Sequence, residues 1–398
     1  MRTSFTYCLK RALLATVLLL AVPAALRAQT TVVSTIRSGG LVREYRLYVP
    51  AIYTRTTGRV PLLLNLHGYG SDNFQQENYG DFRAIADTAN FLVVHPNGVF
   101  DGSNNRNWNT FGPRGTGVDD VAFLAALIDT LASRYRLDPD RIYSTGMSNG
   151  GFMSYELACQ LSNRVAAIAS VTGSMTASRL ATCTSGRPVP VLEIHGTADG
   201  TVPYTGGTAL QFVAIPTLLN SWVTRNGCNP TPTVTMVPDI NPNDGCTAER
   251  SVWSGGRNGS VVEHFRIIGG AHTWPGSAFV IGVTNQDISA SREAWRFLRR
   301  YRLSRLLPTV AAVAQPRLQL VLLPNPATDN LLIQVDNIRL PAETLAVRDA
   351  LGRRVAARAQ ATPEGRLQLA TAAWPAGLYV LSVQLPTGQI LHQKLVKE

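Results

Sequence analysis

The sequence IYSTGMSNG at residues 142–150 joins an apolar run of strand length, 142–145, to the pattern Gly-x-Ser-x-Gly. Residues 150–161 follow with a pattern typical of a helix. A strand that turns sharply into a helix with serine at the turn needs glycines two residues before and after it, because larger side chains would fill the turn. The stretch therefore predicts a strand, a tight turn that exposes Ser148, and a helix.

Other segments repeat this strand-then-helix order on both sides of the turn. Further apolar runs of strand length end at Gly or Pro, and further helices are expected. The strands are 62–66, 91–94 and 189–194, and the helices are 119–134 and 292–302. Continuous apolar runs of this kind are typical of buried parallel strands, so the alternation predicts an α/β sheet. Residues 250–254 and 260–268 flank a Gly-rich turn and predict a hairpin at the sheet edge or an insertion.

A nucleophilic serine needs a base and an acid that orients the base. With a serine at such a turn, the order along the chain is Ser, acid, His. Asp199 follows the strand that ends at His195, and His272 lies in a loop after a later strand. His264 falls inside a strand pattern, so we interpret it as structural. The sequence therefore predicts a catalytic triad of Ser148, Asp199 and His272.

The negative charge that develops on the substrate oxygen needs two N–H donors. We expect the first from Asn149, at the start of a helix whose dipole adds to it. We expect the second from the Tyr69 N–H in the loop after the strand at 62–66, with Gly68 as the alternative. Trp274, two residues after His272, and Trp108 are candidate walls for an acyl group or sugar; core packing is the other interpretation of both.

Other polar clusters receive structural interpretations. Asp119 and Asp120 could suggest a metal pair, but no further ligand spacing lies nearby, so we expect helix capping and no metal. His95 and His195, at strand ends, are expected to be hydrogen-bonded scaffold. The net charge of +11 is mostly scattered. We interpret the basic cluster at 299–305 as the solvated end of a helix, and because no known nucleic-acid-binding module accompanies it we expect no nucleic-acid partner.

The N-terminal residues have the layout of a secretory signal peptide. Basic residues precede an apolar run at 12–22, and small residues follow it. The run is too short to span a bilayer, and no later apolar run is long enough. We expect cleavage after Ala28, with Ala25 as the alternative. Of the chain's 398 residues 45% are hydrophobic and 16% are charged, which excludes a disordered, collagen-like or coiled-coil protein.

Four of the five cysteines remain once the signal containing Cys8 is removed. An even number in an exported protein predicts two disulfides, for which three pairings are possible. We prefer Cys159–Cys183 with Cys228–Cys246, because these pairs close short loops. A zinc site would need paired Cys or His spacing, which the sequence lacks.

The composition changes after residue 307. Residues 308–316 are rich in Pro, Ala and Val without helical periodicity, and we interpret them as a linker. Short strand-like runs follow at 331–335, 344–347, 378–383 and 390–396. The expected organisation is therefore a signal at 1–28, a catalytic domain at 29–307, the linker, and a small all-β domain at 317–398.

The motifs together resemble the secreted esterase family that groups poly(3-hydroxybutyrate) depolymerases with feruloyl and acetylxylan esterases. The matching pieces are LHG at 66–68, GVDDV at 117–121, GMSNGG at 146–151, HGTAD at 195–199 and GGAHTWPG at 269–276. The resemblance implies an α/β-hydrolase fold, the triad Ser148, Asp199 and His272, and no cofactor. Ala271 departs from the family, whose members often have a third glycine there.

The tail resembles a type IX secretion system C-terminal sorting domain. The matching residues are PNPA at 324–327, Asp329, Asp349, GR at 352–353, AGLY at 376–379, Lys394 and Lys397. This resemblance implies a β-sandwich that engages the secretion machinery and takes no part in catalysis.

The leading hypothesis is a secreted serine esterase, extracellular or on the outer cell surface, acting on an ester polymer or oligomer through an acyl-enzyme. A serine peptidase of the same fold and a non-catalytic polymer-binding surface protein are the alternatives. The sequence leaves open the choice between a polyester and a feruloyl or acetyl ester of the plant cell wall.

Overall fold

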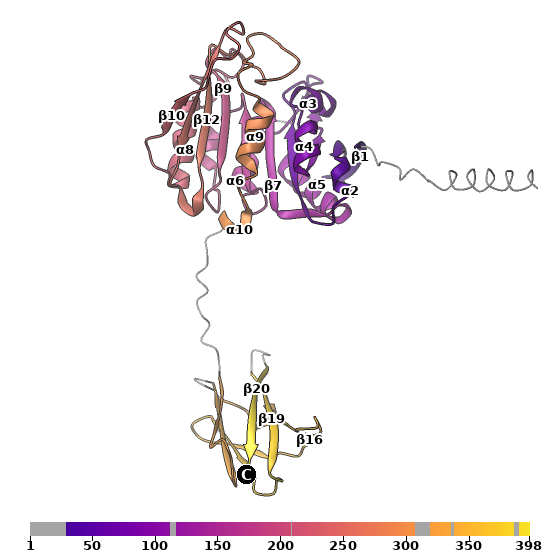
Figure 1. Ribbon diagram of the computed structural model, residues 1–398, viewed down its shortest axis with the longest axis vertical. Coiled ribbons are helices and arrows are strands. Elements are labelled where there is room, and N and C mark those ends of the chain that lie inside the picture. Colours follow the sequence, from indigo (N-terminus) through magenta and orange to yellow (C-terminus); the bar gives the residue numbers. More distant parts are fainter. Residues whose placement is uncertain (1–28, 112–116, 208, 307–318, 336–337, 386–389) are drawn as a thin grey trace, which may run out of the picture. The chain divides into compact units, whose positions relative to one another are not determined.

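The computed structural model describes residues 29–111, 117–207, 209–306, 319–335, 338–385 and 390–398. The chain divides into two compact units, Met1–Pro308 and Thr309–Glu398 (Figure 1). The expected signal at 1–28 and the expected linker at 308–316 lie outside the described residues.

The first unit is built on one ten-stranded sheet with the order β1-β2-β4-β3-β7-β8-β9-β12-β11-β10. Six central strands, β4 to β12 in that order, run parallel, and two antiparallel strands extend the sheet at each edge. The strands are β1 Thr30–Ser38, β2 Leu41–Val49, β3 Val60–Leu66, β4 Leu92–Pro96, β7 Leu137–Met147, β8 Ala167–Val171, β9 Val191–Gly196, β10 Thr233–Met236, β11 Thr247–Trp253 and β12 Val262–Ile268. The predicted α/β sheet is confirmed.

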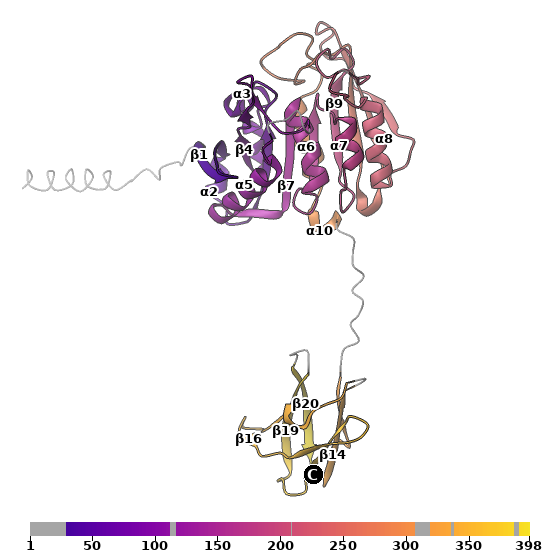
Figure 2. The same ribbon diagram turned by 180° about the vertical axis from the view of Figure 1, so that it is seen from behind.

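Helices cover both faces of this sheet. One face carries α5 Asp120–Arg134, α6 Asn149–Gln160, α7 Ala177–Thr182 and α8 Ile215–Asn226 (Figure 2). The other carries α4 Arg83–Ala89 and α9 Ala290–Leu298 (Figure 1). The shorter helices are α2 Ala51–Thr54, α3 Asn73–Tyr79 and α10 Leu303–Leu306, and a two-stranded hairpin joins β5 Val99–Phe100 to β6 Arg106–Asn107. Because every residue of β3 is buried, its side chains pack alternately against the two helical layers.

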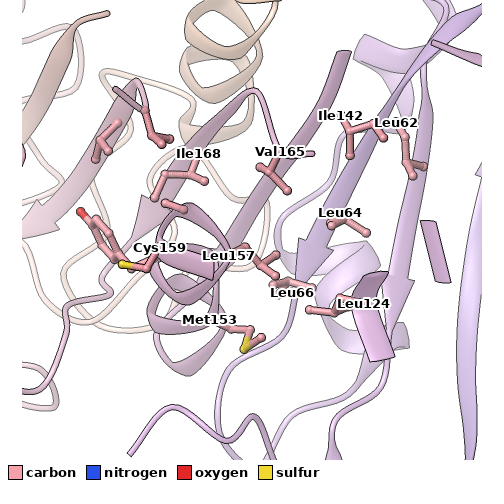
Figure 3. Packing of buried hydrophobic residues seen from close by; sticks show 14 of the residues in the cluster. Leu62, Leu64, Leu66, Leu124, Ile142, Met153, Leu157, Cys159, Val165 and Ile168 are labelled. Carbon is pink, nitrogen blue, oxygen red and sulfur yellow. The ribbon is translucent and has the colours of Figure 1, made fainter. Parts of the chain in front are cut away.

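The helix that follows Ser148 is embedded in the core. All of α6 from Asn149 to Cys159 is buried. Met153 and Leu157 of α6 lie against Leu64 and Leu66 of β3 and Ile168 of β8 (Figure 3). This packing holds the N-terminus of α6, and with it the serine turn, rigidly above the ends of the parallel strands.

The predicted strands and helices are present with small shifts of their ends. The expected hairpin at 250–268 is β11 and β12, but β10 forms the sheet edge, and β12 pairs with β9 inside the sheet. The predicted helix at 292–302 begins at Ala290 and ends at Leu298. Within the basic cluster, Arg300 and Arg302 form ion pairs with Glu263 and Asp138.

The cysteines follow the predicted pairing only in part. Cys159, near the end of α6, forms a disulfide with Cys183, which caps α7. The predicted Cys228–Cys246 bridge is wrong, because both residues are free, buried thiols. Cys228 belongs to the hydrophobic cluster on the α8 face of the sheet, whereas Cys246 belongs to the cluster on the α9 face. Cys228 lies beside Ser260, next to the start of β12, whereas Cys246 lies at the other end of β11 and β12. The length of these strands keeps the two sulfur atoms apart, although only 17 residues separate the cysteines in the sequence.

The second unit is a separate β structure with its own core. Its strands form two four-stranded sheets, β13-β14-β18-β17 and β16-β15-β19-β20, and buried aliphatic side chains of both sheets form one cluster. The strands are β13 Leu320–Leu323, β14 Asn330–Val335, β15 Leu345–Asp349, β16 Arg354–Val355, β17 Ala359–Ala361, β18 Leu367–Ala370, β19 Gly377–Gln384 and β20 Ile390–Lys397. This is the small all-β sandwich expected from the sequence. None of the helices in the described part of the chain is long and apolar enough to cross a membrane.

Candidate active site

The serine turn has the strained geometry that its sequence predicts. Ser148 has φ 53° and ψ −119°, a conformation that non-glycine residues rarely adopt. A Cβ atom at Gly150 would lie 2.1 Å from the Leu66 carbonyl oxygen, and one at Gly146 would lie 2.5 Å from the Gly150 carbonyl carbon. Only glycine fits at either position, so both glycines are required for the turn to form.

Asp199 and His272 come from neighbouring strand ends and meet beside the turn. Asp199 follows β9, and His272 follows β12, which pairs with β9 in parallel. The His272 Nδ1–H donates to Asp199 Oδ2 at 2.7 Å. Asp199 Oδ1 accepts from the backbone N–H groups of Thr201 and Val202, each at 2.8 Å. These contacts orient the imidazole and leave its Nε2 free to act as a base.

The Asp199 carboxylate is fully buried, whereas the His272 side chain is one-fifth exposed. Burial by itself raises the pKa of Asp199, but hydrogen bonds with His195 and His272 and the charges of these rings outweigh burial and hold it well below its ordinary value. The Asp199 carboxyl is therefore ionised throughout the neutral pH range.

The loop after β3 lies against the serine. A Cβ atom at Gly68 would lie 3.5 Å from the Ser148 Cβ. Buried His67 holds this loop, since its Nδ1–H donates to the Gly68 carbonyl oxygen at 2.7 Å and its Nε2 accepts from the Gly98 N–H at 2.9 Å. Burial lowers the pKa of His67 to about 4, so the ring is neutral.

The two N–H groups expected to bind the oxyanion belong to residues close to Ser148: Asn149 follows it in the chain, and Tyr69 lines the same cavity. Outside helices and strands, the hydrogen bonds of the described residues include none that the Tyr69 or Asn149 N–H donates. The Asn149 side chain is occupied elsewhere, because its Oδ1 accepts from the Trp108 N–H at 2.7 Å and its Nδ2 donates to Thr110 Oγ1 at 2.8 Å. This anchorage fixes the start of α6, where the Asn149 N–H is located.

Trp108 and Trp274 do not line the site as the sequence analysis allowed. Both rings are buried, with 0% and 1% of their surface exposed. Trp108 Nε1 donates to the His67 carbonyl oxygen at 2.9 Å, and Trp274 Nε1 donates to Ser291 Oγ at 3.1 Å. The substrate-wall interpretation is wrong, because each indole N–H needs a partner and finds it in the core. Through this hydrogen bond Trp108 supports the loop after β3 from the core side.

Ser148 and His272 open into one cavity of about 710 Å³. Its walls are mostly apolar, and several of these side chains are exposed at its mouth. The apolar lining consists of Met147, Tyr69, Phe74, Tyr79, Phe279 and Ile281. The exposed fractions of Phe74, Phe279 and Ile281 are 58%, 57% and 63%. Exposed apolar side chains gathered at the mouth of a cavity mark a binding surface for an apolar ligand.

Asp119 and Asp120 have separate structural tasks. Asp119 caps α5, since its side chain accepts from the Ala122 N–H at 2.8 Å. Asp120 forms a buried ion pair with Arg43 at 2.7 Å and accepts from the Asn109 N–H. Capping is confirmed for the first aspartate, whereas the second secures the segment beside Trp108.

Comparison with known proteins agrees with this geometry. Residues 43–185 match the family described as esterase PHB depolymerase. The putative esterase NocK of Nocardia uniformis subsp. tsuyamanensis is 31% identical over 293 residues, which cover 68% of this chain and 83% of that protein. The chain belongs to the PHB depolymerase esterase family. It is a carboxylic-ester hydrolase, as the motifs around Ser148 predict.

Other relatives of this esterase differ in the acids that their names mention. The bifunctional acetylxylan esterase/xylanase XynS20E of Neocallimastix patriciarum is 29% identical over 67% of this chain and 34% of that protein. Feruloyl esterase B of Piromyces equi is 32% identical over 43% of this chain and 33% of that protein. The chain thus spans about a third of the length of these two relatives. Acetyl xylan esterase from Aspergillus awamori has a TM-score of 0.49 at 14% identity, covering 67% of this chain and 99% of that structure.

The tail matches a separate family. Residues 321–398 match the secretion system C-terminal sorting domain. The esterase is therefore a secreted or cell-surface protein whose tail directs it to the type IX secretion machinery.

Sequence reasoning missed the apolar lining of the cavity. The tripeptide Phe279-Val280-Ile281 is the one available signal, since three consecutive apolar residues in a loop are unusual for solvent-exposed chain. Phe74 and Tyr79 carry no such signal, because they lie within an ordinary short helix, near its two ends.

Proposed function

We propose that Ser148, His272 and Asp199 form the catalytic triad of this esterase. In this scheme His272 Nε2 takes the Ser148 hydroxyl proton as Oγ attacks the ester carbonyl carbon. The imidazolium then donates that proton to the leaving alcohol, and an acyl-enzyme remains. Water, deprotonated by the same nitrogen, attacks the acyl-enzyme and releases the acid. The 2.7 Å hydrogen bond between His272 Nδ1 and Asp199 Oδ2 carries this assignment.

We infer that the Tyr69 and Asn149 backbone N–H groups bind the oxyanion. Asn149 is the first residue of α6, where the helix dipole favours negative charge. Gly68 is close enough to Ser148 to bring the adjoining Tyr69 N–H to the same side. Because both donors are already in place, no free energy is needed to reorient them when negative charge develops on the substrate oxygen in the transition state.

The proposed substrate is an ester whose acid is bulky and apolar, such as a hydroxycinnamic acid. A cavity of about 710 Å³ is far larger than an acetyl group needs, and aromatic walls such as Phe74 and Phe279 suit a flat ring. The relatives named as feruloyl esterases support this choice.

A 3-hydroxybutyrate polyester is the second candidate. The exposed Phe74, Phe279 and Ile281 at the cavity mouth favour it, because a water-insoluble chain would cover them. A serine peptidase would need groups that bind a peptide backbone, whereas this lining is mostly apolar.

The proposed organisation is a catalytic domain at 29–307, a linker at 308–316 and a sorting domain at 317–398, after a signal at 1–28. All proposed catalytic residues lie in the first unit.

Turnover of p-nitrophenyl acetate, methyl ferulate and 3-hydroxybutyrate oligomers by the wild type and by Ser148→Ala tests both proposals. We expect Ser148→Ala to lose on the order of 10⁴-fold or more in kcat on every ester, with the fold unchanged by circular dichroism. More than a tenth of wild-type activity in Ser148→Ala would refute the triad.

Phe279→Ala tests whether the cavity binds an aromatic acid. We expect it to raise KM for methyl ferulate about tenfold while leaving p-nitrophenyl acetate within twofold, because loss of an aromatic wall costs roughly 1–2 kcal/mol of binding. Val280→Ala is the matched control, since Val280 is exposed in the same loop but does not line the cavity. Faster turnover of the oligomers than of methyl ferulate would favour the polyester instead.

A further inference from the structure

Two ionisable side chains lie behind Asp199 and take no part in the reaction described so far. Glu193 and His195 are both on β9, and neither side chain has any exposed surface. Burying charged groups costs several kcal/mol for each ion unless their partners compensate it. Their presence directly beneath the proposed acid therefore calls for a role.

His195 lies between two carboxylates. Its Nδ1 is 2.9 Å from Glu193 Oε1. Its Nε2 is 2.8 Å from the Val202 carbonyl oxygen and 3.3 Å from Asp199 Oδ2. Carbonyl oxygens and ionised carboxylates only accept hydrogen bonds, so both ring nitrogens carry protons in this arrangement. The ring is an imidazolium with Glu193 on one side and Asp199 on the other.

The hydrogen bonds continue beyond Glu193 into the core. The Tyr155 hydroxyl of α6 donates to Glu193 Oε2 at 2.8 Å. A continuous path therefore runs from Tyr155 through Glu193, His195 and Asp199 to His272. Such a path fixes each side chain by its neighbour on either side.

The remaining polar groups around His195 do not compete for its proton. The His264 Nδ1–H donates to the Glu193 backbone oxygen at 2.9 Å, and its Nε2 accepts from the Tyr204 hydroxyl at 3.1 Å. Burial lowers the pKa of His264 to about 3, so it is neutral. The Tyr204 ring lies 6.0 Å from the His195 ring, and the Arg266 guanidinium lies 5.9 Å from the Tyr204 ring.

The electrostatics agree with the hydrogen-bond pattern. Burial alone lowers the pKa of His195, but hydrogen bonds with Asp199 and Glu193 and their negative charges raise it to about 9. The same positive charge helps to keep the buried Asp199 carboxylate ionised.

We propose that Glu193 and His195 are positioning residues of this esterase: Glu193 holds His195 as an imidazolium, and the imidazolium holds Asp199 ionised with Oδ2 directed at His272. The inference rests on the proposed triad and extends it by one buried ion pair. Neither residue touches the substrate. Their effect reaches the reaction only through the orientation and charge of Asp199.

Glu193→Gln tests this role, because glutamine keeps the shape of the side chain and removes its charge. His195 then loses one of its two carboxylate partners and, because it is fully buried, becomes neutral, so His272 lies in a more negative field. We expect kcat to fall about tenfold with KM within twofold, and the acid limb of kcat/KM to move up by about one pH unit.

His264→Asn is the matched control, because His264 is also buried, on the adjoining strand, but it bonds to the Glu193 backbone oxygen and the Tyr204 hydroxyl and not to the Glu193 carboxylate. We expect it to lower stability without moving the acid limb. An unmoved acid limb in Glu193→Gln, or an equal shift in His264→Asn, would overturn the positioning role.

A direct measurement avoids the need for a stable Glu193→Gln. The ¹⁵N shifts of the wild-type His195 ring should show both nitrogens protonated at pH 7, whereas a neutral ring with the proton on Glu193 overturns the proposal. Tyr155→Phe should move the acid limb in the same direction as Glu193→Gln by a smaller amount. Activity retained in Ser148→Ala refutes the triad itself. An inactive Ser148→Ala beside a Glu193→Gln with wild-type kcat and acid limb refutes the positioning role alone.

Discussion

The ends of β3 and β9 carry the same dipeptide, His-Gly, and bury the histidine equally, but one histidine is neutral and the other is positively charged. His67 at the end of β3 has its pKa lowered to about 4, whereas His195 at the end of β9 has its pKa raised to about 9. Both rings have at most 1% of their surface exposed. The degree of burial therefore does not decide the charge of a buried histidine.

The partners of each ring make the difference. His67 faces one acceptor and one donor, the Gly68 carbonyl oxygen and the Gly98 N–H, so it needs a single proton. His195 faces acceptors on both sides, Glu193 and the Val202 oxygen, so it needs two. One strand end thus supplies a neutral clamp for the proposed oxyanion loop. The other supplies a positive charge beneath the proposed acid.

We expect the largest effect from His67→Phe, which changes the histidine at the end of β3. The substitution keeps a flat ring but removes both hydrogen bonds that hold the loop beside Ser148. We expect kcat to fall on the order of 100-fold, because displacing one oxyanion donor costs this much. The acid limb of the pH profile should not move, since His67 is neutral in the working range. Steady-state kinetics from pH 5 to 9 would measure both quantities.

His95→Phe is the control for this experiment. His95 is equally buried at the end of β4, and neither of its ring nitrogens has a hydrogen-bond partner among the described residues. We expect wild-type kcat within a few-fold. A similar loss in both variants would mean that general packing, and not the loop clamp, explains the His67 result.

The second prediction is that His67 and His195 affect the stability of the fold in opposite pH ranges. The pKa of His67 is lower in the folded chain than its ordinary 6.5, so stability falls as pH decreases from about 6.5 towards 4. The pKa of His195 is raised, so its contribution is complete below pH 6.5 and is lost as pH rises towards 9. Each contribution amounts to roughly 3 kcal/mol in the free energy of unfolding.

Urea unfolding followed by tryptophan fluorescence from pH 4.5 to 9.5 would measure these opposite slopes. We expect His67→Phe to reduce the acid-side slope and leave the alkaline one. His95 and His264, whose pKa values are also lowered by burial, retain part of the acid-side slope. In His195→Gln the alkaline slope between about pH 6.5 and 8 should disappear. Above that range the buried free thiols, whose pKa values are raised by burial, also lower stability as pH rises. A slope between about pH 6.5 and 8 that survives this substitution would place the titrating group elsewhere.

The smallest effect is expected from removing the tail, because neither strand end depends on it. A chain that ends at Gln315 should match the full-length protein in turnover of a soluble ester and in both limbs of its pH profile. In the native host the shortened chain should stay in the periplasm, since it lacks the sorting domain. Loss of activity in a folded, shortened protein would contradict the proposed domain boundaries, and export to the cell surface would contradict the sorting role.

Local sequence predicted the α/β sheet, the serine turn and the sandwich tail, because each depends on short-range rules. Periodicity identifies strands and helices, and Gly146 and Gly150 mark a turn that no other residue could form. β8 escaped prediction because its residues, Ala167–Val171, are mostly small and carry a weak apolar pattern. The cavity lining also escaped, since it comes from loops that only the fold brings together.

The failed assignments share one physical cause. Loop length favoured Cys228–Cys246, but β11 runs from beside one thiol to beside the other and so keeps them at opposite ends of the strand. Proximity in sequence placed Trp274 near the site, but its indole N–H finds a partner in the core. Short separation along the chain does not determine where the fold places a side chain, because the elements between and around the residues set that position.

The sequence by itself predicted the chemistry of this protein: the esterase motifs, the proposed triad of Ser148, Asp199 and His272, and the sorting role of the tail. These follow from residue types at fixed spacings, which any fold able to use them must preserve. Only the tertiary structure decided which groups surround them. The contrast between His67 and His195 depends on whether a hydrogen-bond donor or an acceptor from elsewhere in the chain contacts each ring. The His-Gly dipeptide is identical in both places, so the local sequence does not determine that partner.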